Sequence, residues 1–196
     1  MNTEQLNALM YEALETEMGG QKVYSAAIKC AKNPELKEEW EKYLEETTNH
    51  EQIVRDTFAK LSLDPSVETP GRKIVRHHAE GLVKAMEMAL TSAPEAAEIV
   101  AAECVVLAET KDHLNWKLIG HLGEEVKGPT GKALKEAHEQ VEDQEDEHLY
   151  HTTGWTRELW IESLGLPAVI PPPEEEKEVK SAIGAARAEK ARDSML

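Results

Sequence analysis

The chain has 196 residues, enough for a single substantial hydrophobic core. It carries 38 Asp and Glu against 22 Lys and Arg, and the resulting net charge of −16 argues against nucleic acid or an anionic membrane as a partner. Aromatic residues make up only 5%, while Ala, Glu, Lys and Leu dominate, a composition typical of helical proteins.

The cysteine content and the N-terminus indicate a compartment. Cys30 and Cys104 lie far apart and form no C-x-x-C motif, so they are expected to be small buried hydrophobes in a reducing environment. The first twenty residues lack a basic segment followed by an apolar run, and no apolar stretch approaches about 18 residues. We expect a soluble, cytoplasmic protein that does not enter a membrane.

Two long helices are predicted first, over residues 3–32 and 35–62. Thr3 is expected to cap the first helix, and Asn33-Pro34 ends it and begins the second. Each helix has an apolar stripe that a polar residue interrupts: Glu17 in the first and His50 in the second. Charged groups are rarely buried without a partner or a metal. Both positions are therefore candidate ligands.

The middle of the chain predicts a crossover and a third long helix. Residues 63–73 are rich in turn formers, and a shorter helix is expected over 74–91. The third long helix is predicted over 94–122, where Glu109 and His113 stand between apolar neighbours. The pair lies one helical turn apart, so both side chains are candidates for the same site.

The fourth long helix is predicted from about residue 130 to 154, with a possible extension to 163. It contains Glu145-x-x-His148, which places a carboxylate and an imidazole side by side on an otherwise apolar stripe. Residues 1–163 should form the helical domain. Residues 164–196 should leave it as an extended, proline-rich arm, followed by a charged tail that is either a short surface helix or disordered.

The two long-helix pairs resemble copies of one another, which predicts a pseudo-two-fold bundle. Glu17 and His50 lie about sixteen residues on either side of the first turn, and Glu109 and Glu145 about fourteen residues on either side of the 123–131 loop. All four helices should therefore bring their polar residues to one level. His138 and His151 are expected beside this level, half exposed.

Carboxylates and imidazoles at one depth in a four-helix bundle are the ligands of two-metal carboxylate proteins. One or two iron or manganese ions would suit them, with Glu17, Glu109 and Glu145 as oxygen ligands and His50 and His148 as nitrogen ligands. The second helix departs from the pattern because Thr47 stands where a Glu is usual. Glu46 or Glu51 could swing in, and His113 could supply a replacement. A buried Glu145–His148 ion pair without metal is the alternative.

The stretch Pro34–Phe58, beginning PELK and continuing YLEET, resembles the corresponding helix of the YciE/YciF-type branch of the ferritin-like superfamily. The segment AEGLVKAMEMAL resembles that family's short middle helix. The resemblance implies a ferritin-like four-helix bundle with a short extra helix between the second and third long helices, a carboxylate-rich metal site, frequent dimerisation and stress-linked roles. It also implies two carboxylates three apart in the third helix, which makes Asp112 an alternate to His113, and it makes Thr47 ordinary for this branch.

Three hypotheses follow. In the first, the protein binds iron or manganese, and any activity is oxidation of ferrous iron by oxygen or peroxide. In the second, it is a metal-free structural module that recruits a partner through its C-terminal arm. A haem held between histidines is the third, and the surrounding carboxylates disfavour it. A homodimer is also expected, with the Trp-containing segment 153–166 as a plausible contact.

Overall fold

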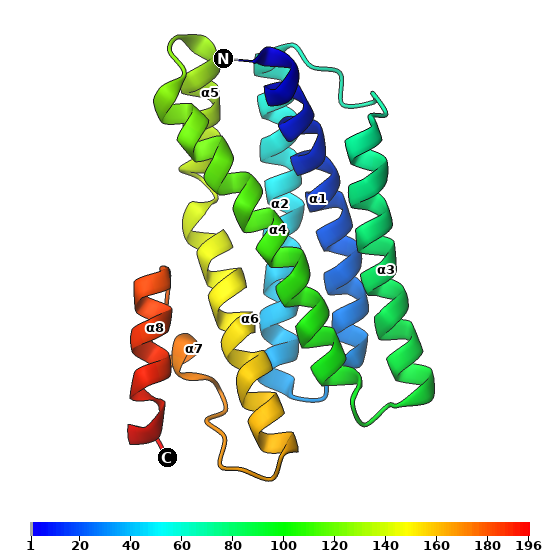
Figure 1. Cartoon of the computed structure of the whole chain (residues 1–196), viewed down its shortest axis with the longest axis vertical. Helices are drawn as coiled ribbons and strands as arrows, with labels where there is room; N and C mark the ends of the chain where they lie inside the picture. The colour runs from blue at the N-terminus through cyan, green and yellow to red at the C-terminus, as the bar shows by residue number, and fades with distance from the viewer. Residues whose placement is uncertain (1) are drawn as a thin grey trace.

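The computed structural model describes residues 2–196 and confirms the predicted all-α fold (Figure 1). No strand occurs in that range. The helices are α1 (Thr3–Cys30), α2 (Pro34–Leu61), α3 (Pro70–Ser92), α4 (Ala97–Glu125), α5 (Pro129–His138), α6 (Glu142–Ser163), α7 (Pro173–Glu176) and α8 (Ala182–Ala191), followed by a 3-10 turn (Arg192–Ser194). Throughout residues 2–196, no helix combines the length and the apolar character that crossing a bilayer requires.

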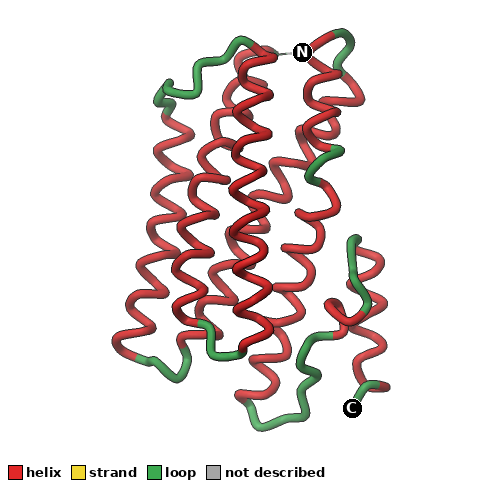
Figure 2. Tube along the Cα trace, turned by 180° about the vertical axis from the view of Figure 1, so that it is seen from behind, coloured by secondary structure: helices red, strands yellow, loops and turns green. Residues whose placement is uncertain are grey.

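The long helices run side by side along the longest axis of the molecule (Figures 1 and 2). The α1 helix packs against α2, α3 and α4, while α4 also packs against α5 and α6. The α5 and α6 helices follow one another as a single column, and both contact α2. The α3 helix lies at the edge, against α1 and α4, and is longer than the predicted span 74–91.

Side-chain caps and prolines set most helix starts. Asn2, and not Thr3 as expected, caps α1: its side-chain oxygen accepts hydrogen bonds from the backbone N–H groups of Glu4 and Gln5. Asn33 caps α2 in the same way ahead of Pro34. The α3 helix begins four residues earlier than predicted, because Thr69 caps it and a proline occupies its first position.

The predicted fourth helix is two helices, interrupted at residues 139–141. The N–H groups of Gln140 and Val141 bond three residues back, to Ala137 and His138, so the last turn of α5 tightens before α6 begins. The sequence there has no Pro or Gly to reveal the break. It does have Glu142, a carboxylate in the first turn of α6, where negative charge favours a helix N-terminus.

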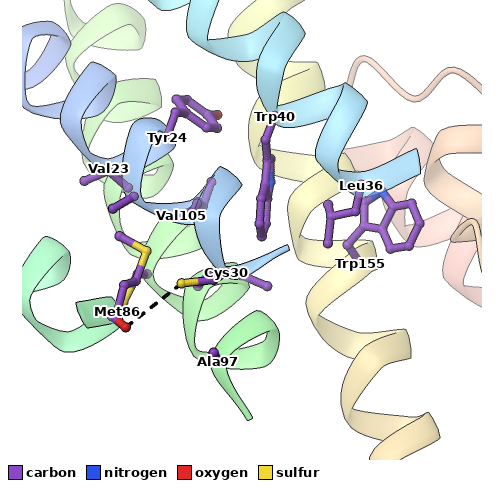
Figure 3. Close-up of a cluster of buried hydrophobic side chains, with 14 of the residues drawn as sticks. Val23, Tyr24, Cys30, Leu36, Trp40, Met86, Ala97, Val105 and Trp155 are labelled. Atoms are coloured by element: carbon purple, nitrogen blue, oxygen red, sulfur yellow. Dashed lines mark hydrogen bonds between the residues drawn. The ribbon is translucent and has the colours of Figure 1, made fainter. Parts of the chain in front are cut away.

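The buried apolar residues form two clusters. The first gathers around Trp40, Tyr24 and Trp155 (Figure 3). It also contains both cysteines, which are free and buried as expected, and Cys30 Sγ lies 4.0 Å from the carbonyl oxygen of Met86. The second cluster joins the other ends of α1, α2 and α4 with α5. Between the two clusters, each of α1, α2, α4 and α6 contributes buried polar residues.

The C-terminal arm does not leave the domain as predicted. Residues 164–172 are irregular, but α7 and α8 then fold back and pack against α6 (Figure 1). The guanidinium of Arg157 donates to both carboxylate oxygens of Glu174, at 2.7 and 2.8 Å. This bidentate ion pair anchors the arm. Gly154 permits the approach, because a Cβ there would lie 2.5 Å from Glu174 Oε2.

Candidate metal centre

The polar layer between the two apolar clusters holds the residues that the sequence predicted as ligands. Glu17 comes from α1, His50 from α2, Glu109 from α4, and Glu145 and His148 from α6, and each is at most 2% exposed. Two groups of three side chains each bring a ligand atom within 4.8 Å of one another, and Glu145 belongs to both. The layer therefore offers two adjacent positions for cations that share one carboxylate.

The first group consists of His50, His148 and Glu145. The two imidazole rings stack, with centroids 5.6 Å apart. His50 Nδ1 lies 2.9 Å from Glu145 Oε1, but without the alignment of a hydrogen bond. His148 Nδ1 lies 3.6 Å from Glu109 Oε2, beyond hydrogen-bonding distance. The Nδ1 atoms of both rings thus have no hydrogen-bond partner.

The Nε2 atoms of both rings have hydrogen-bond partners. His50 Nε2 lies 2.8 Å from the amide oxygen of Gln144, and His148 Nε2 lies 2.9 Å from the carboxylate of Glu46. Gln144 in turn donates from its amide nitrogen to Glu46 at 3.0 Å. An amide oxygen and a carboxylate can only accept here, so each ring donates its Nε2–H and keeps Nδ1 directed inward. Histidines that bind metals are usually oriented in this way.

The second group consists of Glu17, Asp112 and Glu145. Trp116 donates its indole N–H to Glu17 Oε1 at 2.7 Å and leaves Oε2 without a partner. Asp112, considered in the sequence only as an alternate ligand, is 3% exposed and has an unpaired Oδ1. Three carboxyl groups therefore converge in the buried interior of the bundle.

Unpaired buried polar atoms are concentrated in this layer. Most buried polar atoms in proteins have hydrogen-bond partners, because leaving one unpaired costs about 1–3 kcal/mol. The six ligand candidates that combine the two groups with Glu109 each contribute one unpaired atom: Glu17 Oε2, His50 Nδ1, Glu109 Oε2, Asp112 Oδ1, Glu145 Oε2 and His148 Nδ1. In their deprotonated forms these oxygen and nitrogen atoms can offer lone pairs to a divalent cation.

Burial makes the carboxyl groups hard to ionise without added positive charge. Burial, reinforced by Asp112 and Glu145, raises the pKa of Glu17 well above its usual value. The pKa of Asp112 rises for the same reasons, burial first and then the charges of Glu145 and Glu109. Burial and Glu109 also raise the pKa of Glu145. These shifts favour the protonated carboxyl groups in the absence of a cation.

The pKa values of the two histidines shift in opposite directions. Burial opposes the charge on His148, but the carboxylates of Glu109 and Glu46 outweigh it and raise the pKa of His148 to about 10. Burial and the neighbouring His148 charge lower the pKa of His50. One imidazole is thus protonated near neutral pH and the other is neutral. The protonated one acts as the positive charge of the metal-free cluster.

Some predicted residues lie outside the two groups. His113 Nε2 lies 2.6 Å from Asp146, on the rim of the layer, so the structure does not bring His113 to the ligand atoms. Of the two glutamates proposed to replace the missing ligand, Glu46 reaches the site, but against the outer nitrogen of His148. Glu51 instead bonds Gln21 and Arg55.

Two residues of the site were not predicted from the sequence. Gln144 anchors His50, although its position directly before Glu145 could have drawn attention to it. Tyr24 is fully buried with an unpaired hydroxyl, and burial and Glu109 raise its pKa well above the usual value. Its aromatic ring made it indistinguishable from an ordinary core residue.

The fold and this layer define an all-α protein with a buried cluster of carboxyl and imidazole side chains, which could hold a metal ion. Comparisons with protein-family models, with curated proteins and with solved structures found no match.

Proposed function

We propose that the chain is a ferritin-like four-helix protein that binds iron or manganese in its core. The observation that carries this proposal is the set of six buried ligand-type side chains, each with an unpaired atom, arranged as two groups around Glu145. Packing alone gives no reason to bury such atoms unpaired, since that arrangement is costly. A cation would satisfy them together.

Each group corresponds to one ion. His50 Nδ1, His148 Nδ1 and Glu145 would hold the first, and Glu17, Asp112 and Glu145 the second. Carboxylate oxygens favour hard cations and imidazole extends the choice to iron and manganese, so the mixed set suits those two metals. Iron bound here would supply redox chemistry toward oxygen or peroxide, in line with the ferritin-like resemblance.

The protein's own contribution is to hold the ligands and to release protons. The outer contacts of Gln144 and Glu46 keep both imidazoles aimed inward. Ligands bind metals in their deprotonated forms, so the protons on Glu17, Asp112, Glu145 and His148 must leave as cations enter. Binding should therefore tighten as pH rises, until hydroxide competes for the metal.

Metal analysis tests the proposal. Protein reconstituted with Mn²⁺, or with Fe²⁺ under anaerobic conditions, should retain about two ions per chain, the number that a four-helix carboxylate site holds. His148→Gln should retain fewer ions. His113→Gln is the matched control, because it removes an imidazole of the same layer that lies outside both groups, and it should bind as the wild type does. A chain that retains no metal would instead support the metal-free helical module.

The homodimer stays a prediction. Trp155, within the proposed contact segment, is fully buried in the monomer. Trp160, Leu164 and Leu166 remain exposed at 45%, 67% and 56%, so this end of α6 retains apolar surface for a second copy. Recruitment of another protein through the arm would have to use the faces of α7 and α8 that do not pack against α6.

A further inference from the structure

A cavity of about 460 Å³ lies outside the core layer, between α2, α6 and the folded-back arm. Six glutamates line it, and its lining residues include one lysine, Lys42, and no arginine. The arm contributes Glu175, and α6 contributes His151, which was predicted to be half exposed but is only 4% exposed. An acidic cavity alone would be a solvated surface feature. This cavity differs from an ordinary acidic surface because it contains His151, one ring nitrogen of which is buried without a hydrogen-bond partner.

Glu39 fixes the orientation of His151. The Glu39 carboxylate lies 3.2 Å from His151 Nδ1, accepts the indole N–H of Trp155 at 2.6 Å, and accepts the hydroxyl of Tyr43. Burial favours the neutral acid, but hydrogen bonds from His151, Tyr43 and Trp155 outweigh it and lower the pKa of Glu39. An ionised carboxylate only accepts, so His151 donates from Nδ1.

The other ring nitrogen of His151, Nε2, has no hydrogen-bond partner. In the neutral ring Nε2 carries a lone pair, and it is buried without a hydrogen-bond partner. A carboxylate on one ring nitrogen and a free lone pair on the other is the arrangement that orients histidines toward metals.

Glu175 supplies a second candidate metal ligand at the same cavity. Its Oε2 atom is buried and unpaired. Burial, together with the nearby charge of Glu39, raises the pKa of Glu175 to about 8. The cavity is therefore lined by two buried atoms without hydrogen-bond partners, Glu175 Oε2 and His151 Nε2.

We propose that His151 Nε2 and Glu175 bind a divalent first-row transition-metal cation in this cavity, with Glu39 positioning the imidazole. Among residues 2–196, the three-ligand groups within 4.8 Å are the two in the core, so the outer cation keeps water in its remaining positions. The open cavity has room for that water. This site does not depend on the function proposed for the core, and it gives the folded-back arm a role as a contributor of a ligand.

Site-resolved nuclear magnetic resonance of the ring nitrogens tests the inference on the full chain. Without metal, His151 should be the Nδ1–H tautomer. Titration with Zn²⁺, which is diamagnetic and accepts imidazole and carboxylate ligands, should shift the His151 Nε2 resonance. The resonances of His50 and His148 report the core separately, so failure there is distinguishable from failure here.

Two variants separate a built site from general acidity. Glu175→Gln should weaken the Zn²⁺ response of His151 at least about tenfold, the lower end of the loss expected for groups that support a metal site. Glu38→Gln removes one exposed carboxylate from the same cavity and should weaken it much less. An unmoved His151 resonance, an Nε2–H tautomer, or equal effects of the two variants would each overturn the inference.

Discussion

Replacing Glu145 by Gln should remove most of the metal-dependent stabilisation without destabilising the metal-free protein. Glu145 belongs to both ligand groups, and its Oε2 atom is buried and unpaired. Because burial raises its pKa in the folded state, the stabilising contribution of the carboxyl group is fully present below its ordinary pKa of 4.5, and it is lost as pH rises from there through the folded-state value. A neutral amide avoids that loss, so at about pH 8 the metal-free variant should be at least as stable as the wild type.

The size of the metal effect follows from linkage. A cation at about 100 times its Kd stabilises the folded state by about 2.7 kcal/mol. For a chain of this length, about 1 kcal/mol corresponds to about 2–4 °C in Tm, so the wild type should gain about 5–11 °C. If the substitution weakens binding by about 100-fold, the same cation concentration adds only about 0.4 kcal/mol, or about 1–2 °C.

Calorimetry of both proteins, with Mn²⁺ and with a chelator, measures these four transitions. Equal metal-induced shifts in the wild type and the variant would refute the shared role of Glu145. A metal-free variant that melts well below the metal-free wild type would refute the claim that this carboxyl group is a burden in the absence of a cation.

Three further predictions concern the stability of the protein. The stability of the metal-free protein should fall as pH rises from 6.5 to about 10, because the folded state binds the proton of His148 more tightly than the unfolded state does over this range. Metal-loaded protein should lose less stability. Thermal melts across this pH range measure both. Trp116→Phe removes the indole donor to Glu17, so urea unfolding should show a loss of about 1–3 kcal/mol. Arg72→Ala breaks a buried ion pair at 2.8 Å with Glu15, and the same assay should show a loss of about 3 kcal/mol with metal stoichiometry unchanged.

The level of the site could be predicted because helical geometry converts residue counts directly into depth. Glu17, His50, Glu109 and Glu145 each interrupt an apolar stripe at matching distances from a turn, and the structure places them in one layer. Nothing in that argument requires knowledge of tertiary contacts.

Side-chain direction within the layer could not be predicted in the same way. His113 and Asp112 are adjacent in sequence, so their side chains point about 100° apart around α4, and the rotational setting of the helix decides which of them faces inward. The structure turns Asp112 inward and pairs His113 with Asp146 at the rim. Glu46 shows the same limit, since a long side chain beside the stripe can reach an outer nitrogen as readily as a metal position.

The folded-back arm escaped prediction for a different reason. Its composition, rich in proline and glutamate, is typical of a solvated linker. The arm is held instead by specific partners distant in sequence, in particular Arg157 with Glu174 and Glu158 with Arg192. Such pairings between an acidic arm and an acidic helix are invisible to composition.

Anomalous diffraction from crystals loaded with Mn²⁺ tests the central claim most directly. Two strong manganese peaks should appear in the layer between the apolar clusters, one beside His50 and His148 and the other beside Glu17 and Asp112, with Glu145 contacting both. A fully loaded crystal with no manganese peak in that layer would contradict it.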